Sequence, residues 1–584
     1  MLADRVIENL PDASGRTDVV AESVVAGVGH VFASGTPFGY LFPDLADRWP
    51  ADHLPTRDPG AVVAALKALG SAMVEGDDSL ADDGSESVPT DPRPGATDLA
   101  LDSTITPIYT YWGQFIDHDI TANTDRDDDL SIVDRHLVPA SPKFVADHLQ
   151  NLREPSLNLD SLYGDGPEGK GDDAVPFVGA RLLEGKLADA GDDQQSPTIP
   201  IPPISPAGAD RSRDLPRHES GENIRRARIG DGRNDENLIV AQLHTAFLLA
   251  HNRAVNLVDP NLPNPAPESV KNNDATFVEA RRLLRWTYQW LVRNDFLVRL
   301  VPQDAIDAVE EAPRFVPTTR GVYMPLEFSV AAYRFGHSMV RSAYDWNRNF
   351  GDPSTGFFTR ATFDQLFQFT GGGGFINGAD TLPDNWPAEW DRLVDVEPGF
   401  PPATNDESPA RFARKIDTRV AFPLDELRNE GNDVNTARRV REILKRLAVR
   451  NLLRGYKLAI PTGQAVAREY GLTPLSSAEL LTGTNRVLKH ALTDGEFLEA
   501  TPLWFYVLKE AELSGGDQLG PLGGRIVAET LIGQLKHDSG SYLAQEPAWD
   551  PRAKGVAGGS RTLVDLGANP IGKIADLLRF AGVL

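Results

Sequence analysis

The chain has 584 residues, with 84 Asp and Glu against 58 Lys and Arg, a formal net charge of −26 and no cysteine. The lack of cysteine excludes a disulfide framework, zinc–cysteine sites, iron–sulfur clusters, cysteine nucleophiles and thiolate-ligated haem. The negative charge argues against nucleic acid or an anionic membrane surface as the main partner, while 41% hydrophobic residues suffice for a large core.

Residues 1–75 predict an N-terminal arm that packs on the body of the protein. Met1–Leu10 lacks the basic head and apolar stretch of a Sec signal peptide. The apolar stretch Val19–Val31 is interrupted and too short to span a membrane. We therefore expect a soluble protein, either cytoplasmic or exported by a route that the sequence does not reveal. Residues 76–98, rich in Asp, Ser, Gly and Pro, predict an acidic flexible loop.

Six segments carry apolar residues at three- and four-residue spacing and predict helices. They are Thr104–Thr121, Glu236–Val258, Phe277–Leu300, Leu326–Ser342, Ala437–Tyr456 and Gly523–Lys536. Strand-type alternation is scarce, and the Pro- and Gly-rich zones 186–222 and 371–409 predict long loops. The pattern favours a mainly α fold: one large helical domain with long irregular loops, a core over 99–470, and a helical extension of the same domain over 471–584.

The first of these segments contains the motif WGQFIDHDIT. On a helix, Gln114, Asp117 and His118 lie at positions i, i+3 and i+4 and share one face, while Asp119 is turned about 100° away from His118. Apolar neighbours would bury this face, and buried polar groups need partners or a ligand. The alternative is a capped helix with a hydrogen-bonded core histidine.

The second motif, RNDENLIVAQLHTAFLLAHNR, begins at Arg233. Arg233 and Glu236 lie near a helix start, where an exposed ion pair with a cap is the simpler interpretation. His244 and His251 share one face of that helix, and histidines so flanked by apolar residues are more often core residues than ligands.

The third motif, AAYRFGHSMV, places Arg334 and His337 on one helical face. Gly336 lies directly before the histidine. Glycine inside a helix costs roughly 1 kcal/mol relative to alanine. Either a flat cofactor against His337 or a close helix crossing would account for it.

Together the three motifs, followed by Arg450, Asn451 and Arg454 in RNLLRG, resemble the animal-type haem peroxidases of the peroxidase–cyclooxygenase superfamily. The matches follow the family's chain order over residues 100 to 470. The resemblance implies a peroxidase that binds haem b, reduces hydrogen peroxide and oxidises a small phenolic or halide substrate.

The resemblance also implies roles for single residues. His118 would be the distal acid–base group, because a neutral imidazole can take up and return a proton, and Arg233 would stabilise the charge that builds as the O–O bond breaks. His337 would be the iron ligand, and the oxygen of Asn451 would accept its Nδ1 proton. Gln114 would hold water or a halide.

The resemblance places five residues around haem: His337, Asn451, Asp117, Glu236 and Arg334. Asp117 and Glu236 match carboxylates that form ester links to haem in vertebrate members, so covalent haem is open to this chain. Asn237 follows Glu236 and excludes a methionine sulfonium link.

The resemblance further implies a calcium ion. Asp119 matches a calcium ligand, and the loop SLNLDSLYG matches the family's calcium loop. Asn158 stands there in place of the usual aspartate and Asp160 in place of the usual serine, and Ser156 begins the loop.

Three rival functions can be compared with a peroxidase. A fatty-acid oxygenase of the same superfamily has its radical tyrosine three residues before the proximal histidine, where this chain has Arg334, with Tyr333 one residue further away. A non-haem metal hydrolase lacks a suitable pair of ligands one turn apart. A scaffold that has lost haem would not need His118, Arg233 and His337. The sequence does not indicate the oligomeric state.

Overall fold

The structure is a computed structural model, and it describes residues 36–56, 58–75, 101–122, 130–189, 203–204, 211–263, 270–318, 321–351, 359–395, 411–427, 430, 432 and 436–584. Within these residues twenty α-helices accompany seven short strands. The predicted mainly α fold in one domain is confirmed.

The N-terminal elements are β1 (Thr36–Gly39), α1 (Pro43–Asp47) and α2 (Pro59–Ala72). Helix α2 begins where the Asp58 side chain accepts a hydrogen bond from the Ala61 amide at 3.1 Å, and Pro59 fits the first helical turn. It packs on α13 (Leu447–Lys457) and α16 (Arg486–Asp494). Residues 1–35 of the predicted arm and the predicted acidic loop 76–98 lie outside the described residues.

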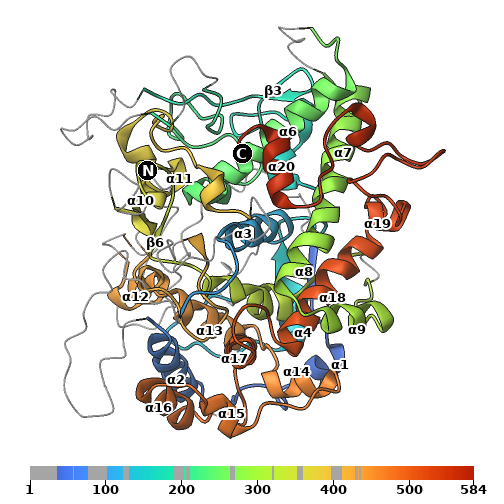
Figure 1. The fold of residues 1–584 in the computed structure, drawn as a ribbon. Coiled ribbons are helices and arrows are strands. Elements are labelled where there is room, and N and C mark those ends of the chain that lie inside the picture. Colours follow the sequence, from blue (N-terminus) through green and yellow to red (C-terminus); the bar gives the residue numbers. More distant parts are fainter. Residues whose placement is uncertain are drawn as a thin grey trace.

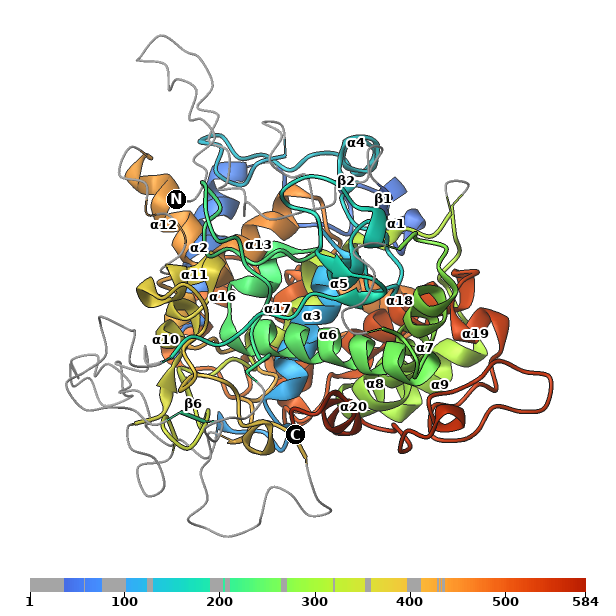
Figure 2. The ribbon, with the colours of Figure 1, turned by 90° about the horizontal axis from the view of Figure 1, so that it is seen from above.

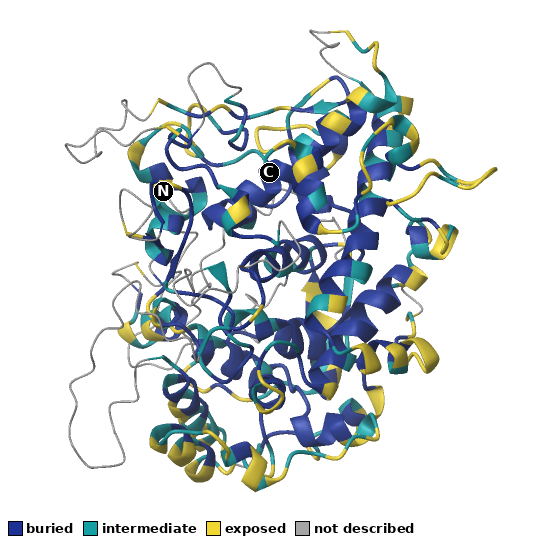
Figure 3. Cartoon of the chain, in the orientation of Figure 1, coloured by how far each residue is buried: buried dark blue, intermediate teal, exposed yellow. Residues whose placement is uncertain are grey.

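Helix α3 (Ile108–Ile120) occupies the centre of the molecule, and α6 (Leu238–Val258) packs against it (Figures 1 and 2). Helix α7 (Ala275–Leu291) packs on α6 and continues through a π-helical turn, η5 (Val292–Phe296), into α8 (Leu297–Leu300). Asn237 and Asp274 cap the starts of α6 and α7 through their side-chain oxygens. The central helices are largely buried (Figure 3).

The other helices surround this centre. They are α4 (Pro142–His148), α5 (Asp160–Tyr163), α9 (Gln303–Glu311), α10 (Phe363–Gln368), α11 (Gly371–Gly374), α12 (Arg438–Lys445), α14 (Gly463–Glu469), α15 (Ser477–Leu481), α17 (Leu503–Leu513), α18 (Pro521–His537), α19 (Tyr542–Gln545) and α20 (Ile574–Ala581). Within the described residues no helix is both long and apolar enough to cross a bilayer.

The strands are short and tie distant segments together. β1 pairs antiparallel with β2 (Gln150–Asn151) and parallel with β5 (Met324–Pro325), with Thr36 opposite Asn151 and Phe38 opposite Met324. β3 (Phe177–Val178) pairs with β4 (Arg181–Leu182), and β6 (Ala343–Tyr344) pairs with β7 (Ala361–Thr362).

Two predicted helices are interrupted. The segment predicted as Ala437–Tyr456 breaks at Arg446, whose extended backbone separates α12 from α13. The segment predicted as Leu326–Ser342 forms a π-helical turn, η6 (Glu327–Ala331), followed by a 3₁₀ helix, η7 (Ala332–His337). The change occurs at Ala331, whose φ of −128° and ψ of −77° fit neither helix. Helices α17 and α18 pack on η6 and η7, and α20 packs on α6.

Candidate active site

A cavity of about 360 Å³ lies between α3 and η7. His118 from α3 and His337 from the end of η7 both line it. The other lining residues that the sequence predicted are Gln114, Asp117, Arg233, Glu236 and Arg334. Asn451 lies outside the lining and reaches His337 from α13. The structure thus brings the distal and proximal motifs to one cavity.

Helix α3 presents its polar face to this cavity as the spacing predicted. Trp112, Phe115 and Ile116 are fully buried and anchor the helix in the core. Asp119, one residue after His118, points away and accepts hydrogen bonds from Leu159 and Ser161.

His118 is held by its Nδ1, which donates to Asn234 Oδ1 at 2.8 Å. Burial lowers the pKa of His118 to about 4, and the neighbouring Arg233 guanidinium acts in the same direction. The imidazole is therefore neutral at neutral pH. Its other ring nitrogen, Nε2, is left for the cavity that His118 lines.

Arg233 lies in a short 3₁₀ helix, η4 (Gly232–Asp235), which the Asp231 side chain caps. Its guanidinium donates to Asp231 at 2.7 Å and to the carbonyl oxygens of Thr121 at 2.7 Å and His118 at 3.2 Å. These contacts fix the cation at the end of α3, beside His118. The exposed ion pair suggested as an alternative does not form, because Arg233 is tied to buried Asp231 rather than to Glu236.

Sequence reasoning missed the support of Arg233. Asp231 is fully buried, and Arg153, also fully buried, donates to it at 3.0 Å. Behind η4 lies the glycine run of α11: a Cβ on Gly371 would come within 2.5 Å of the Asp235 carboxylate. The GGGG sequence could have indicated this close packing, since four glycines in a row allow another part of the backbone to approach.

On the other side of the cavity, Arg334 and His337 lie three residues apart in η7. Side chains at i and i+3 are in line in a 3₁₀ helix, so the predicted shared face is kept although the helix type differs. A Cβ on Gly336 would meet no atom within 4 Å, so a close helix crossing does not explain this glycine. The open space next to His337 can accommodate a flat group.

Asn451 contacts His337 through its amide nitrogen, whereas the expected contact was through its oxygen. Arg334 Nη1 donates to Asn451 Oδ1 at 3.0 Å, so the amide nitrogen Nδ2 faces His337 Nδ1 at 2.8 Å. With Nδ1 as acceptor, the ring proton of neutral His337 is on Nε2. A metal bound at Nε2 would need that proton on Nδ1 and the Asn451 amide turned round.

Charged groups complete the lining. Burial raises the pKa of Glu236 to about 8, and the nearby Glu430 adds to this effect. Arg334, Arg450 and Arg454 line the cavity on the side of His337. Their positive charges suit the two propionates of haem, so together with the space at Gly336 the residues present fit this cofactor.

Of the predicted calcium residues, Asp119, Asn158 and Asp160 lie together, and a calcium ion there stays a prediction. The Asp119 carboxylate accepts from the amides of Leu159 at 3.1 Å and Ser161 at 3.2 Å, and the Ser161 hydroxyl and the buried Asp160 carboxylate are its oxygen-bearing neighbours. Asn158 Oδ1 accepts from the Asp160 amide at 3.1 Å. In the described part of the chain, no group of three or more His, Asp or Glu side chains could hold a metal.

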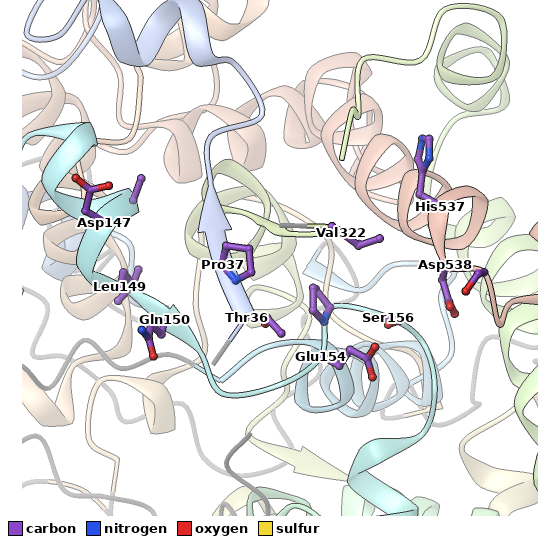
Figure 4. A pocket seen from close by; sticks show the side chains of 14 residues that line it. Thr36, Pro37, Asp147, Leu149, Gln150, Glu154, Ser156, Val322, His537 and Asp538 are labelled. Carbon is purple, nitrogen blue, oxygen red and sulfur yellow. The ribbon is translucent and has the colours of Figure 1, made fainter. Parts of the chain in front are cut away.

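The predicted loop residue Ser156 instead lines a second, larger cavity of about 640 Å³ (Figure 4). This cavity lies between β1, the end of α4 and the end of α18, where His537 and Asp538 face it. Glu154 and Asp147 are also among its lining residues. It contains none of the histidines and arginines around His118 and His337, so its size does not make it the reactive site.

Comparison with known proteins identifies the segment that holds most of these residues. The animal haem peroxidase family profile matches residues 181–373, which include Arg233, Glu236, Arg334 and His337. This segment is an animal haem peroxidase domain. His118 and Asn451 lie outside the matched residues. The fold brings His118 to the same cavity and Asn451 into contact with His337.

Two curated proteins with peroxidase in their names are similar to this chain. A peroxidase-like protein of Margaritifera margaritifera is 29% identical in an alignment of 304 residues that covers 45% of this chain and 35% of that protein. Human thyroid peroxidase is 25% identical over 187 residues, 32% of this chain and 19% of that protein. The matched part of the chain thus spans about a third or less of the length of these relatives.

Two solved structures are similar to this chain over most of its length. Peroxidase A of Dictyostelium discoideum has a TM-score of 0.50 and 15% identity, covering 87% of this chain and 88% of that chain. A fatty acid alpha-dioxygenase of Oryza sativa has a TM-score of 0.46 and 14% identity, covering 75% of this chain and 70% of that chain. The first supports the fold, and the second has no bearing on activity.

Proposed function

We propose that this protein is a haem-dependent peroxidase that reduces hydrogen peroxide and oxidises small phenolic or halide substrates. The observation that carries the proposal is the cavity that His118 and His337 share, with Arg233 fixed beside His118. One histidine is thereby available as an iron ligand and the other as an acid–base group.

Haem, when bound, supplies the iron at which the O–O bond is cleaved with two electrons. His118, neutral in the fold, would take the proton from one peroxide oxygen and return it to the departing oxygen, which leaves as water. The Arg233 guanidinium would stabilise the negative charge on that oxygen. Gln114 lines the cavity and would orient a water molecule or a halide. The reducing substrate restores the two electrons.

His337 would hold the iron, and Asn451 would orient the His337 ring from behind. Arg334, Arg450 and Arg454 would hold the haem propionates. His337→Ala removes the ligand while leaving the cavity open.

The decisive test is haem reconstitution of purified protein, followed by absorption spectroscopy. We expect a Soret band of histidine-ligated ferric haem that changes in His337→Ala, and peroxide-dependent oxidation of a phenol that falls by at least about 100-fold in His118→Ala. Absence of a Soret band, or a band that His337→Ala leaves unchanged, would falsify the proposal.

Ester links to haem form a finer part of the proposal. Asp117 and Glu236 both line the cavity, so each carboxylate is available to a haem methyl group. After turnover with peroxide, we expect haem to stay with the protein in acid–acetone extraction and to be released from the double variant Asp117→Ala with Glu236→Ala. Complete extraction from the parent protein would contradict the links.

One observation keeps the fatty-acid oxygenase as a second candidate. Tyr333 lines the same cavity, and its buried hydroxyl has no hydrogen-bond partner among the described residues. The ring is stacked on Phe328 at 4.4 Å. Substantial oxygen uptake with linoleate, lost in Tyr333→Phe, would favour the oxygenase over the peroxidase.

A further inference from the structure

Asn234 lies between two buried histidines, His118 of α3 and His244 of α6. Its Oδ1 is 2.8 Å from His118 Nδ1, and its Nδ2 is 3.1 Å from His244 Nδ1. Asn234 and His244 are fully buried, and His118 is 7% exposed. The three side chains therefore form a connected row that begins at the cavity and ends in the core.

The row has a direction, because an amide has distinct donor and acceptor ends. Oδ1 can only accept, so His118 Nδ1 must donate and must carry the ring proton. Nδ2 can only donate, so His244 Nδ1 must accept and its proton is on Nε2. Were the amide reversed, His118 would carry its proton on Nε2 and could not accept another from a molecule in the cavity.

His244 lies at the donor end of the Asn234 amide, with its Nδ1 3.1 Å from Nδ2. Its ring packs edge-on against Phe115 at 5.9 Å, and its Nε2 is buried with no hydrogen-bond partner among the described residues. Burial lowers the pKa of His244 to about 3, so the ring is neutral and has one unprotonated nitrogen, which at Nδ1 accepts from Asn234 Nδ2.

The charged groups near His118 do not compete for its Nδ1. They are Arg233, Asp231 and Asp117. Arg233 and Asp231 are bound to each other at 2.7 Å, and Asp117 accepts from the Thr121 hydroxyl at 3.0 Å. Asn234 is thus the side chain that holds His118 Nδ1.

We propose that Asn234, backed by His244, is a positioning residue that fixes His118 in the Nδ1–H tautomer, so that Nε2 presents its lone pair to the cavity. The role of that lone pair as a base rests on the proposed peroxidase function. The tautomer itself does not depend on that function, and it can be measured without haem.

The first experiment measures the tautomer in the full-length apoprotein. Nitrogen NMR of protein labelled with [15N]histidine distinguishes a protonated from an unprotonated ring nitrogen, and His118→Gln identifies the His118 signals by their disappearance. We expect a protonated Nδ1 and an unprotonated Nε2. A protonated Nε2, or an even mixture of tautomers, overturns the proposal without any variant of Asn234 having to fold.

The second experiment compares two substitutions of Asn234. Asn234→Leu removes the acceptor at similar volume, and we expect the tautomer preference to be lost. Asn234→Asp keeps an acceptor for His118 Nδ1 and is expected to restore the preference. A preference unchanged in Asn234→Leu would show that the amide does not set it.

The third experiment uses the haem-reconstituted protein. Because a base in the wrong tautomer cannot take the peroxide proton, the rate constant for reaction with hydrogen peroxide should fall about 10- to 100-fold in Asn234→Leu, with the haem spectrum intact. The rate constant should also fall in His244→Leu. His251 is a buried histidine of the same helix that contacts Tyr163 and Ala180, so His251→Leu is the matched control and should leave the rate constant unchanged.

The two proposals fail in different ways. A protein that binds no haem but has the Nδ1–H tautomer loses the peroxidase function and keeps the positioning role of Asn234. A protein with peroxidase activity and a protonated His118 Nε2 keeps the function and loses the role of Asn234.

Discussion

At the scale of single residues, Gly336 and His337 would each contribute differently to holding the proposed haem. The histidine offers a ring nitrogen, and the glycine leaves the neighbouring space open, since a Cβ there would touch nothing within 4 Å. Alanine would cost the 3₁₀ helix nothing but would occupy the space that a flat group needs.

We therefore expect Gly336→Ala to leave the free energy of unfolding of the apoprotein unchanged or raised by up to about 1 kcal/mol. Haem affinity should fall roughly tenfold, because overpacking costs about 1 to 3 kcal/mol. Calorimetry of the apoprotein and a Soret titration measure the two effects. Gly455→Ala, also without a near neighbour, serves as the control. Unchanged haem affinity would mean that haem does not lie against Gly336.

At this scale, residue types and spacing predicted only some of the residues of the candidate site. His118, Arg233 and His337 were recognisable because each lies in a local motif, and the structure brings all three to one cavity. The roles of Arg153, Asp231 and Asn234 were not, because Arg153 meets Asp231 across 78 positions and Asn234 meets His118 across 116. The contact of Asn451 with Arg334 was not predicted, because it depends on how η7 meets α13.

At the scale of elements, η6 and η7 show where periodicity fails. The apolar spacing over 326–342 predicts one α-helix, yet the backbone tightens from a π-helical turn to a 3₁₀ helix at Ala331. Tertiary contacts set this geometry. Buried Glu327, at the start of η6, accepts hydrogen bonds from the backbone amides of Leu41 at 2.8 Å and Phe42 at 3.3 Å. A carboxylate therefore ties the N-terminal segment after β1 to the element that leads to His337.

Glu327 predicts a specific dependence of stability on pH. Burial raises its pKa to about 7 in the fold, above the value of about 4.3 in an unfolded chain, so the folded state binds more protons between these values. Its contribution to stability is therefore full below about pH 4.3 and falls as pH rises toward 7. Between pH 5.5 and 7.5, the parent protein should lose about 2 kcal/mol more than Glu327→Gln.

Urea unfolding at the two pH values measures this difference. Glu426→Gln, an exposed position, is the matched control and should behave like the parent protein. An equal loss in the parent protein and in Glu327→Gln would show that Glu327 does not titrate in this range.

At the scale of the whole molecule, the C-terminal helices close the side of the site behind His337. Trp504 of α17 donates its indole N–H to the Arg334 carbonyl at 3.1 Å, and its ring centroid lies 6.5 Å from that of His337. Helix α18 packs on η6 and η7, and α20 packs on α6. Composition and periodicity predicted helices after residue 470 but could not assign them this position, which depends on long-range packing.

A chain that ends at residue 470 should therefore fail to form the site. Removing α17 and α18 exposes buried faces of η6 and η7, and we expect loss of the cooperative urea transition and of the histidine-ligated Soret band. Circular dichroism and haem titration measure both. A truncated chain that unfolds cooperatively and binds haem like the full chain would show that residues 471–584 are independent of the peroxidase core.

The residues that line the cavity come from positions as far apart in the chain as Tyr109 and Arg454. A ribosome must therefore synthesise the chain at least as far as Arg454 before the cavity, the proposed place for haem, can form. Because a ligand that binds only the folded state stabilises that state, haem taken up at this late step would stabilise all the segments that meet at the cavity. The availability of haem would then decide how much of the newly made chain persists in its folded form.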